Sequence, residues 1–259
     1  MPIFAAGSDP GANFGELLKR VGMSPFTDRS DANDLTIPHA TTCVAMRFAG
    51  GVVMAGDRRA TSGNLISHRS MEKVVQADEL SGVAIAGAAG AAMEMIKLFQ
   101  LQLEHYEKVE GQTLSLEGKA NQLSMFVRSN LPAAMQGLAV VPIFAGFDLL
   151  SSSGRLWDYD VTGGRYEEKD FVATGSGMLH ASTVMRVSWR RDLSSIDAIK
   201  LCARALWEAA DADSATGGPD SLRGIYPVVA SITRDGWLAV SDSTLADIYK
   251  EITNEVGLR

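Results

Sequence analysis

The sequence is poor in the residues that build disulfides and metal sites. Its 259 residues include only two cysteines, Cys43 and Cys202, and four histidines scattered along the chain. No CxxC pair and no Cys/His ligand spacing occurs, so we expect neither a structural zinc site nor a metal cofactor. Each cysteine lies in an apolar stretch, which predicts two buried thiols in a protein of a reducing compartment.

Long apolar runs and basic clusters are missing as well. The sequence has no run of about 18 or more apolar residues, so we expect no membrane span. Residues 1–20 lack a basic start followed by an apolar core, which argues against a secretory signal peptide. The formal net charge is −7 and there is no Lys/Arg-rich run, which argues against a nucleic-acid partner. We therefore expect a cytoplasmic protein.

The composition changes sharply at residue 41. Residues 1–40 are rich in Gly, Pro, Asp, Asn and Ser, with one short helix-like piece at 14–21, and they predict a loosely ordered leader. Hydrophobic residues make up 46% of the chain, which is enough for a sizeable core. We therefore divide the chain into a leader, 1–40, and one domain, 41–259.

Within the domain, runs of alternating or continuous apolar residues predict strands, and 3.6-residue spacing predicts helices. Strand groups separated by paired helices favour an α+β sandwich over alternating βαβ units. In the first helix we expect a buried stripe that includes Met93. The expected strands are 42–48, 52–55, 73–75, 82–87, 140–146, 155–161, 171–174, 226–233 and 238–241, with a turn at 163–164. The expected helices are 88–108, 116–130 (stopped by Pro132), 179–189, 195–210 (capped by Ser194) and 245–253.

A threonine stands where the composition changes. Thr41 precedes an expected buried strand, and a β-branched residue there is common and needs no functional explanation. If the chain were cut before Thr41, however, its own α-amino group, with an ordinary pKa of about 8, would lie beside the hydroxyl. That amine could take the hydroxyl proton directly or through one water. One residue would then supply both nucleophile and base.

Residues that could support such a site occur at the ends of the expected elements. Asp57 follows the first hairpin and Lys73 begins a strand, although isolated charges at such places are more often solvated. Gly175-Ser176-Gly177 lies between a strand and a helix, where a hydroxyl and backbone N–H groups can face a site. Asp213 follows a helix, where a C-terminal cap is the ordinary interpretation.

Taken together and in order, these motifs resemble those of the proteasome β-subunit family, most closely its actinobacterial members. The resemblance covers Thr41 to about Ile252, and the intact set differs from the inactive β subunits and the α subunits of the family. The motifs are Thr41-Thr42, Gly56-Asp57-Arg58, Lys73, Gly87, Gly175-Ser176-Gly177 and Asp213-x-x-Thr216-Gly217-Gly218. The narrower match rests on GGVVMAGDRR (50–59), HYEKVE (105–110), AMQGL (134–138) and DSATGGPD (213–220).

The resemblance implies the fold of the N-terminal nucleophile hydrolases. This is a four-layer αββα sandwich of two mainly antiparallel sheets flanked by helices. It also implies peptide-bond hydrolysis through an acyl-ester on Thr41, with no metal or organic cofactor. Residues 1–40 would be a propeptide that is removed by self-cleavage between Ala40 and Thr41.

The resemblance further implies a role for each matching residue. Thr41 Oγ would attack the scissile carbonyl, and its freed amine would act as base. Lys73 would lower the pKa values of the hydroxyl and the amine through its positive charge. Asp57 would pair with Lys73 and hold it in place.

Four further positions would complete the site. Asp213 and Ser176 would hydrogen-bond around the Thr41 amine and orient it, while the backbone N–H of Gly87 would form the oxyanion hole. Thr216 stands where many members carry serine, and it keeps the hydroxyl.

Ala40 departs from the glycine usual before the catalytic threonine. Its Cβ restricts the turn that self-cleavage needs, so we expect slower processing.

Apolar residues match the family's first substrate pocket, which implies a preference for a large apolar side chain before the cut. Met93 also lies on the helix stripe, so ordinary core packing remains an alternative for it. Thr61 matches the residue whose backbone pairs with an extended substrate as an added strand. The matching pocket positions are Ala60, Met71, Val75, Ile85, Ala89 and Met93.

The resemblance implies assembly with other β subunits and with proteasome α subunits into stacked seven-membered rings, α7β7β7α7. It also implies a ring ATPase that unfolds substrates and feeds them in, and substrates that carry a small protein tag. Two alternatives stay open: a hydrolase of small amides with the same fold, and a non-catalytic ring subunit. Cleavage of an extended peptide tests the first, and the activity of a Thr41→Ala variant tests the second.

Overall fold

The computed structural model describes residues 41–257. The predictions made for residues 1–40, namely the leader, its helix-like piece at 14–21 and the bond after Ala40, lie outside the described residues.

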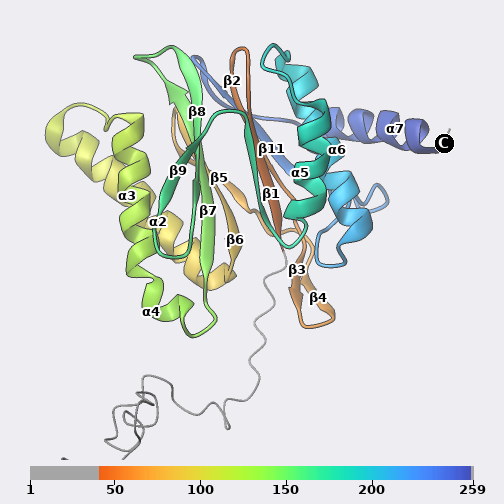
Figure 1. Ribbon diagram of the computed structural model, residues 1–259, viewed down its shortest axis with the longest axis horizontal. Helices are drawn as coiled ribbons and strands as arrows, with labels where there is room; N and C mark the ends of the chain where they lie inside the picture. Colours follow the sequence, from red (N-terminus) through yellow and green to blue (C-terminus); the bar gives the residue numbers. More distant parts are fainter. Residues whose placement is uncertain (1–40, 258–259) are drawn as a thin grey trace, which may run out of the picture. The chain divides into compact units, whose positions relative to one another are not determined.

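Two five-stranded antiparallel sheets form the centre of the domain (Figure 1). The first sheet has the order β10-β1-β2-β11-β12 and the second has the order β5-β6-β7-β8-β9. The strands of the first sheet are β1 (Thr42–Phe48), β2 (Gly51–Gly56), β10 (Phe171–Gly175), β11 (Val228–Thr233) and β12 (Gly236–Ala239). Those of the second are β5 (Val74–Asp78), β6 (Ser81–Gly87), β7 (Val140–Asp148), β8 (Ser153–Tyr159) and β9 (Arg165–Glu168).

Helices cover the outer face of each sheet, as Figure 1 shows. One core lies between the first sheet and its helices, a second lies between the other sheet and its helices, and a third lies between the sheets. The first sheet is covered by α5 (Met178–Ser188) and α6 (Ser195–Ala212), with α7 (Asp242–Gly257) packed against α6, and the second by α2 (Ala89–Glu110) and α3 (Leu116–Ser129). The predicted four-layer αββα fold is thereby confirmed.

Side chains along the central strands alternate between two cores. In β1, Cys43 and Ala45 face the other sheet, whereas Val44 and Met46 face the helices. Successive side chains of a strand point to opposite faces, and here both faces are covered. This double coverage explains why the strands read as nearly continuous apolar runs.

The sequence patterns missed four elements for identifiable reasons. The hairpin of β3 (Ala60–Ser62) and β4 (Leu65–His68) is short, and every residue of β4 is exposed, so no apolar alternation marks it. The strand that follows the turn at 163–164 is β9, an edge strand with the polar sequence RYEE. Pro132 lies in the first turn of a short helix, α4 (Leu131–Ala134), where proline is tolerated because its missing N–H is not needed.

The predicted stripe on α2 was wrong at Met93. That side chain is 36% exposed, whereas Met95 is 5% exposed and packs with Ile96 and Phe99. The cap on α6 was right, since Ser194 Oγ accepts a hydrogen bond from the amide of Asp197 at 3.2 Å.

Two glycines provide a matched test of the close contact between the sheets. A Cβ at Gly154 in β8 would lie 2.4 Å from the carbonyl carbon and oxygen of Gly51 in β2, so Gly154→Ala should lower the free energy of unfolding by about 1–3 kcal/mol. A Cβ at Gly90, in the first turn of α2, would meet nothing within 4 Å, so Gly90→Ala should raise it by about 0.4–1 kcal/mol. Chemical denaturation of both variants measures the difference, and equal midpoints would contradict the close packing.

Candidate active site

A buried ion pair connects the two sheets. Asp57 follows β2 of the first sheet and Lys73 precedes β5 of the second, and both side chains are fully buried. Lys73 Nζ lies 2.8 Å from Asp57 Oδ1 and also donates to the carbonyl of Arg59 at 2.5 Å. Burying two charges is expensive unless further hydrogen bonds satisfy them.

Backbone amides satisfy the remaining capacity of the Asp57 carboxylate. Oδ1 accepts the amide of Thr42 at 2.8 Å, in addition to Lys73. Oδ2 accepts the amides of Arg59 and Gly217, each at 2.8 Å. Each oxygen thus has two donors, and these fix the carboxylate to three separate segments of the chain.

A second carboxylate gathers the hydroxyl groups. Asp213 ends α6, and its Oδ2 accepts Ser176 Oγ and Thr216 Oγ1, each at 2.6 Å. Its Oδ1 accepts the amide of Ala215 at 3.2 Å. Although burial opposes it, the hydrogen bonds from Ser176 and Thr216 hold the pKa of Asp213 below its usual value, so the group is ionised at neutral pH.

Thr41 lies against this second group. It is buried immediately before β1, and its carbonyl accepts the amide of Ser176 at 2.8 Å. Ser176 Oγ, whose proton goes to Asp213, lies 3.3 Å from the same carbonyl oxygen. The structure thus brings Thr41, Ser176, Asp213 and Thr216 together through hydrogen bonds. Asp57 and Lys73 adjoin the same segment through the amide of Thr42.

Thr42 is the residue to which the sequence analysis gave no role. Its hydroxyl lies 2.5 Å from Thr216 Oγ1 and accepts the amide of Gly177 at 3.0 Å. The Thr41-Thr42 motif contains this residue, but only the fold brings residue 216 to it. No signal within the sequence alone marks that contact.

Glycine is required at two places for steric reasons. Gly175 has φ +97°, and a Cβ there would lie 1.8 Å from the carbonyl oxygen of Thr41. Gly87, at the end of β6, has φ +115°, and a Cβ there would lie 2.1 Å from the carbonyl oxygen of Ala139. L-amino acids with side chains rarely adopt such φ values, so both turns depend on glycine.

The residues expected to line the substrate pocket come from β3, the segment before β5, β5, β6 and α2. Ile85 is buried, and with Val75 it packs in the core under α2. Ala60, Thr61 and Met71 are half-buried. Ala89 and Met93, on the first turn and a half of α2, are exposed, so they are available to a ligand.

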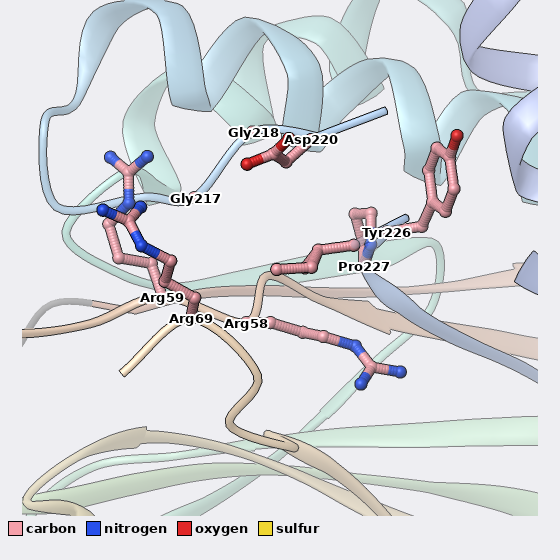
Figure 2. Close-up of a pocket in the computed structure, with 9 residues that line it drawn as sticks. Arg58, Arg59, Arg69, Gly217, Gly218, Asp220, Tyr226 and Pro227 are labelled. Atoms are coloured by element: carbon pink, nitrogen blue, oxygen red, sulfur yellow. The ribbon is translucent and has the colours of Figure 1, made fainter. Parts of the chain in front are cut away.

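A small hollow of about 40 Å³ adjoins the segments that hold Asp57. Arg59 forms part of its wall, and the Arg59 guanidinium donates to the carbonyl of Ser214 at 2.9 Å. Figure 2 shows that the side chain of Arg58 points away from those of Arg59 and Arg69. The residues lining the hollow are Arg58, Arg59, Arg69, Gly217, Gly218, Asp220, Ile225, Tyr226 and Pro227.

Both cysteines are buried free thiols, as predicted. Burial raises the pKa of Cys43 to about 12, so its thiol remains protonated and is not a nucleophile. Within residues 41–257, no three His, Cys, Asp or Glu side chains gather to hold a metal ion. In the same part of the chain, no helix has the length and apolar character needed to cross a membrane.

Comparison with known proteins identifies the family. Residues 37–222 match the sequence model of the proteasome subunit family. The chain is 52% identical over 260 residues to the proteasome subunit beta of Acidimicrobium ferrooxidans, covering 100% of this chain and 95% of that protein. It is 57% identical over 215 residues to that of Streptomyces griseus, and 54% identical over 220 residues to that of Acidothermus cellulolyticus. Each of these two alignments covers 83% of this chain and 76% of the relative.

The match covers most of the chain, and the folded domain has the four-layer architecture that the family's motifs imply. The chain therefore belongs to the proteasome subunit family as a β subunit, a threonine endopeptidase.

Proposed function

We propose that residues 1–40 are a propeptide, that residues 41–259 are the catalytic domain, and that cleavage of the Ala40–Thr41 bond frees Thr41 as the nucleophile. The observation that carries this proposal is the placement of residues 41 and 42 between two anionic groups. The carbonyl of Thr41 binds Ser176, which in turn binds Asp213. The amide of the next residue binds Asp57, which holds the buried Lys73.

In the proposed reaction, Thr41 Oγ attacks the scissile carbonyl while its proton passes to the Thr41 amine, directly or through one water. The proton is then given to the departing amine, which leaves an acyl-ester on Thr41. Water hydrolyses this ester, returns a proton to Oγ and releases the acid. The positive charge of Lys73, which Asp57 holds in place, favours the deprotonated forms of the hydroxyl and the amine.

Four other residues have supporting roles. Asp213 and Ser176 orient the freed amine, and Thr216 holds Asp213 through its 2.6 Å hydrogen bond. The backbone N–H of Gly87 stabilises the oxyanion, a contribution of about 3 kcal/mol for one such donor in the transition state. The positive φ of Gly87 supports this assignment, because it requires a glycine, and a residue without a side chain leaves its backbone N–H open to a substrate.

Removal of the leader uses the same chemistry on the chain itself. Thr41 Oγ attacks the carbonyl of Ala40, the peptide bond becomes an ester, and water cleaves that ester. The two contacts from Ser176 to the Thr41 carbonyl fix residue 41 from its C-terminal side during this step. The methyl group of Ala40 restricts the turn on the other side, so we expect slower processing than with glycine.

The residues expected to line the substrate pocket are all uncharged, and most are apolar. We propose that the pocket accepts a large apolar side chain before the cut, because none of its six expected residues is charged. The substrate backbone pairs with that of Thr61 in β3 as an added strand. The exposed side chain of Met93 and the exposed methyl group of Ala89 support this use of the first turns of α2.

As a β subunit, the chain assembles with α and other β subunits into the proteasome core particle. We propose stacked seven-membered rings, α7β7β7α7, served in the cytoplasm by a ring ATPase that delivers tagged proteins. The outer helices support extensive contacts between subunits, since α2 and α3 expose large apolar side chains. These are Leu98, Leu101, Val109 and Met125.

Processing is tested by the intact mass of the chain after co-expression with its α subunit. We expect the wild-type chain to begin at Thr41, and a Thr41→Ala chain to keep its leader and lose peptidase activity. Thr253→Ala, which removes an exposed hydroxyl from α7, is the matched control and should be processed normally. A full-length wild-type chain in an assembled particle would contradict the proposal and favour a structural subunit. Hydrolysis of small amides but not of extended peptides would favour the amidohydrolase alternative.

The buried ion pair allows stability to be separated from catalysis. Asp57→Asn and Lys73→Met each remove one member of the buried ion pair, so each should lower the free energy of unfolding by about 3–5 kcal/mol. The double variant removes both charges and should recover part of that stability, because the asparagine still has only one oxygen for the backbone amides that the Asp57 carboxylate accepts. Peptidase activity should stay at least about 100-fold below wild type in all three, because the cation that assists proton transfer is missing or misplaced. Recovery of activity along with stability would assign the pair a structural role alone.

A further inference from the structure

Thr42 is attached at both its backbone and its side chain. Its amide donates to Asp57 Oδ1 at 2.8 Å, and its carbonyl accepts the amide of Asp57 at 3.1 Å. Its hydroxyl reaches the opposite group, lying 2.5 Å from Thr216 Oγ1 and 3.0 Å from the amide of Gly177. Thr42 is fully buried, so no water replaces these contacts.

The hydroxyl protons around Thr42 have only one consistent arrangement. The Asp213 carboxylate can only accept when ionised, so Thr216 donates its single proton to Asp213 Oδ2. The short contact between the two threonine hydroxyls therefore requires Thr42 to donate to Thr216. The remaining acceptor capacity of Thr42 faces the Gly177 N–H. A directed chain thus runs from Gly177 through Thr42 and Thr216 to Asp213, and each bond in it strengthens the next.

The site around the hydroxyl is closely fitted. A Cβ at Gly177 would lie 2.5 Å from Thr42 Oγ1 and 2.8 Å from Thr216 Oγ1, so only a glycine backbone can approach the pair. Valine at position 42 would have the right shape and a high strand propensity. It would nevertheless leave the Gly177 N–H without an acceptor and place a methyl group against Thr216. The hydroxyl therefore has a function that side-chain volume and strand propensity do not explain.

From this geometry we propose that Thr42 is a positioning residue for Thr41. Its hydroxyl fastens the start of β1 to Asp213 while its amide fastens the same point to Asp57, so the neighbouring nucleophile has a fixed place between them. This inference rests on the proposed role of Thr41. Because small displacements of a reacting group lower turnover, loss of the hydroxyl reduces kcat and leaves substrate binding in the β3 and α2 pocket unchanged.

The test compares Thr42→Val with Thr42→Ser in the assembled particle, with kcat and KM expressed per chain whose mass shows a free Thr41. We expect Thr42→Val to lower kcat by about tenfold or more with KM within about twofold, and Thr42→Ser, which keeps the hydroxyl, to remain close to wild type. If the wild-type chain itself is not cut before Thr41, the proposed function fails. If the wild-type chain is cut normally and Thr42→Val has the wild-type kcat, only the inference about Thr42 is overturned.

Ser124→Ala is the matched control for general destabilisation. It removes another buried hydroxyl, which donates to the carbonyl of Gly163 at 2.5 Å in the other half of the sandwich. We expect it to lower thermal stability and to leave kcat unchanged. The inference would be overturned if kcat fell as much in Ser124→Ala as in Thr42→Val. It would also be overturned if kcat fell as much in Thr42→Ser as in Thr42→Val.

If Thr42→Val fails to assemble, Thr42→Ala takes its place in the comparison with Thr42→Ser. Thr216→Val removes the same link from its other end, together with the hydrogen bond to Asp213. It should lower kcat with KM unchanged, as Thr42→Val does. If both single variants assemble, the kcat of the double variant should be no lower than that of the single variant with the lower kcat, because the two changes remove one shared interaction. Independent, multiplicative losses would show that the two hydroxyls do not act together.

Discussion

The domain is organised around a pair of opposite charges kept away from water. Asp57 follows a strand of one sheet and Lys73 precedes a strand of the other, and both are fully buried, so the pair meets where the two sheets pack. Their attraction alone does not offset the loss of hydration. Amides from Thr42, Arg59 and Gly217 complete the coordination. The first hairpin, the start of β3 and the segment after α6 are thus held by one carboxylate.

The hydroxyl groups form a separate arrangement on the other side of the strand start. Ser176 and Thr216 converge on Asp213, and Thr42 joins this group to the backbone that Asp57 holds. The two carboxylates therefore have different tasks: Asp57 neutralises a buried cation, whereas Asp213 orients hydroxyls. Residue 42 is the only residue among those described that is hydrogen-bonded to Asp57 and to Thr216.

The sequence predicted much of the fold because both faces of both sheets are buried, which makes strands such as β1 and β7 almost continuously apolar. It failed where burial is slight, as in β4, whose residues are all exposed, and in the polar edge strand β9. The motifs named Asp57, Lys73, Ser176 and Asp213 in advance. The part played by the Thr42 hydroxyl was invisible, because its partners are defined by tertiary packing and not by spacing along the chain.

The hydrogen bonds of the site join parts of the chain that are made at very different times. Thr42 binds a residue 174 positions later, and Thr41 is contacted by a residue 135 positions later. While the ribosome is still adding α5 and α6, the first threonines have emerged, but Asp213 and Thr216 do not yet exist. The network can close only after almost the whole domain has been synthesised and its two sheets have packed. A nascent chain therefore cannot contain the completed hydrogen-bond network. Other proteins that are still being synthesised nearby do not meet a completed site on it.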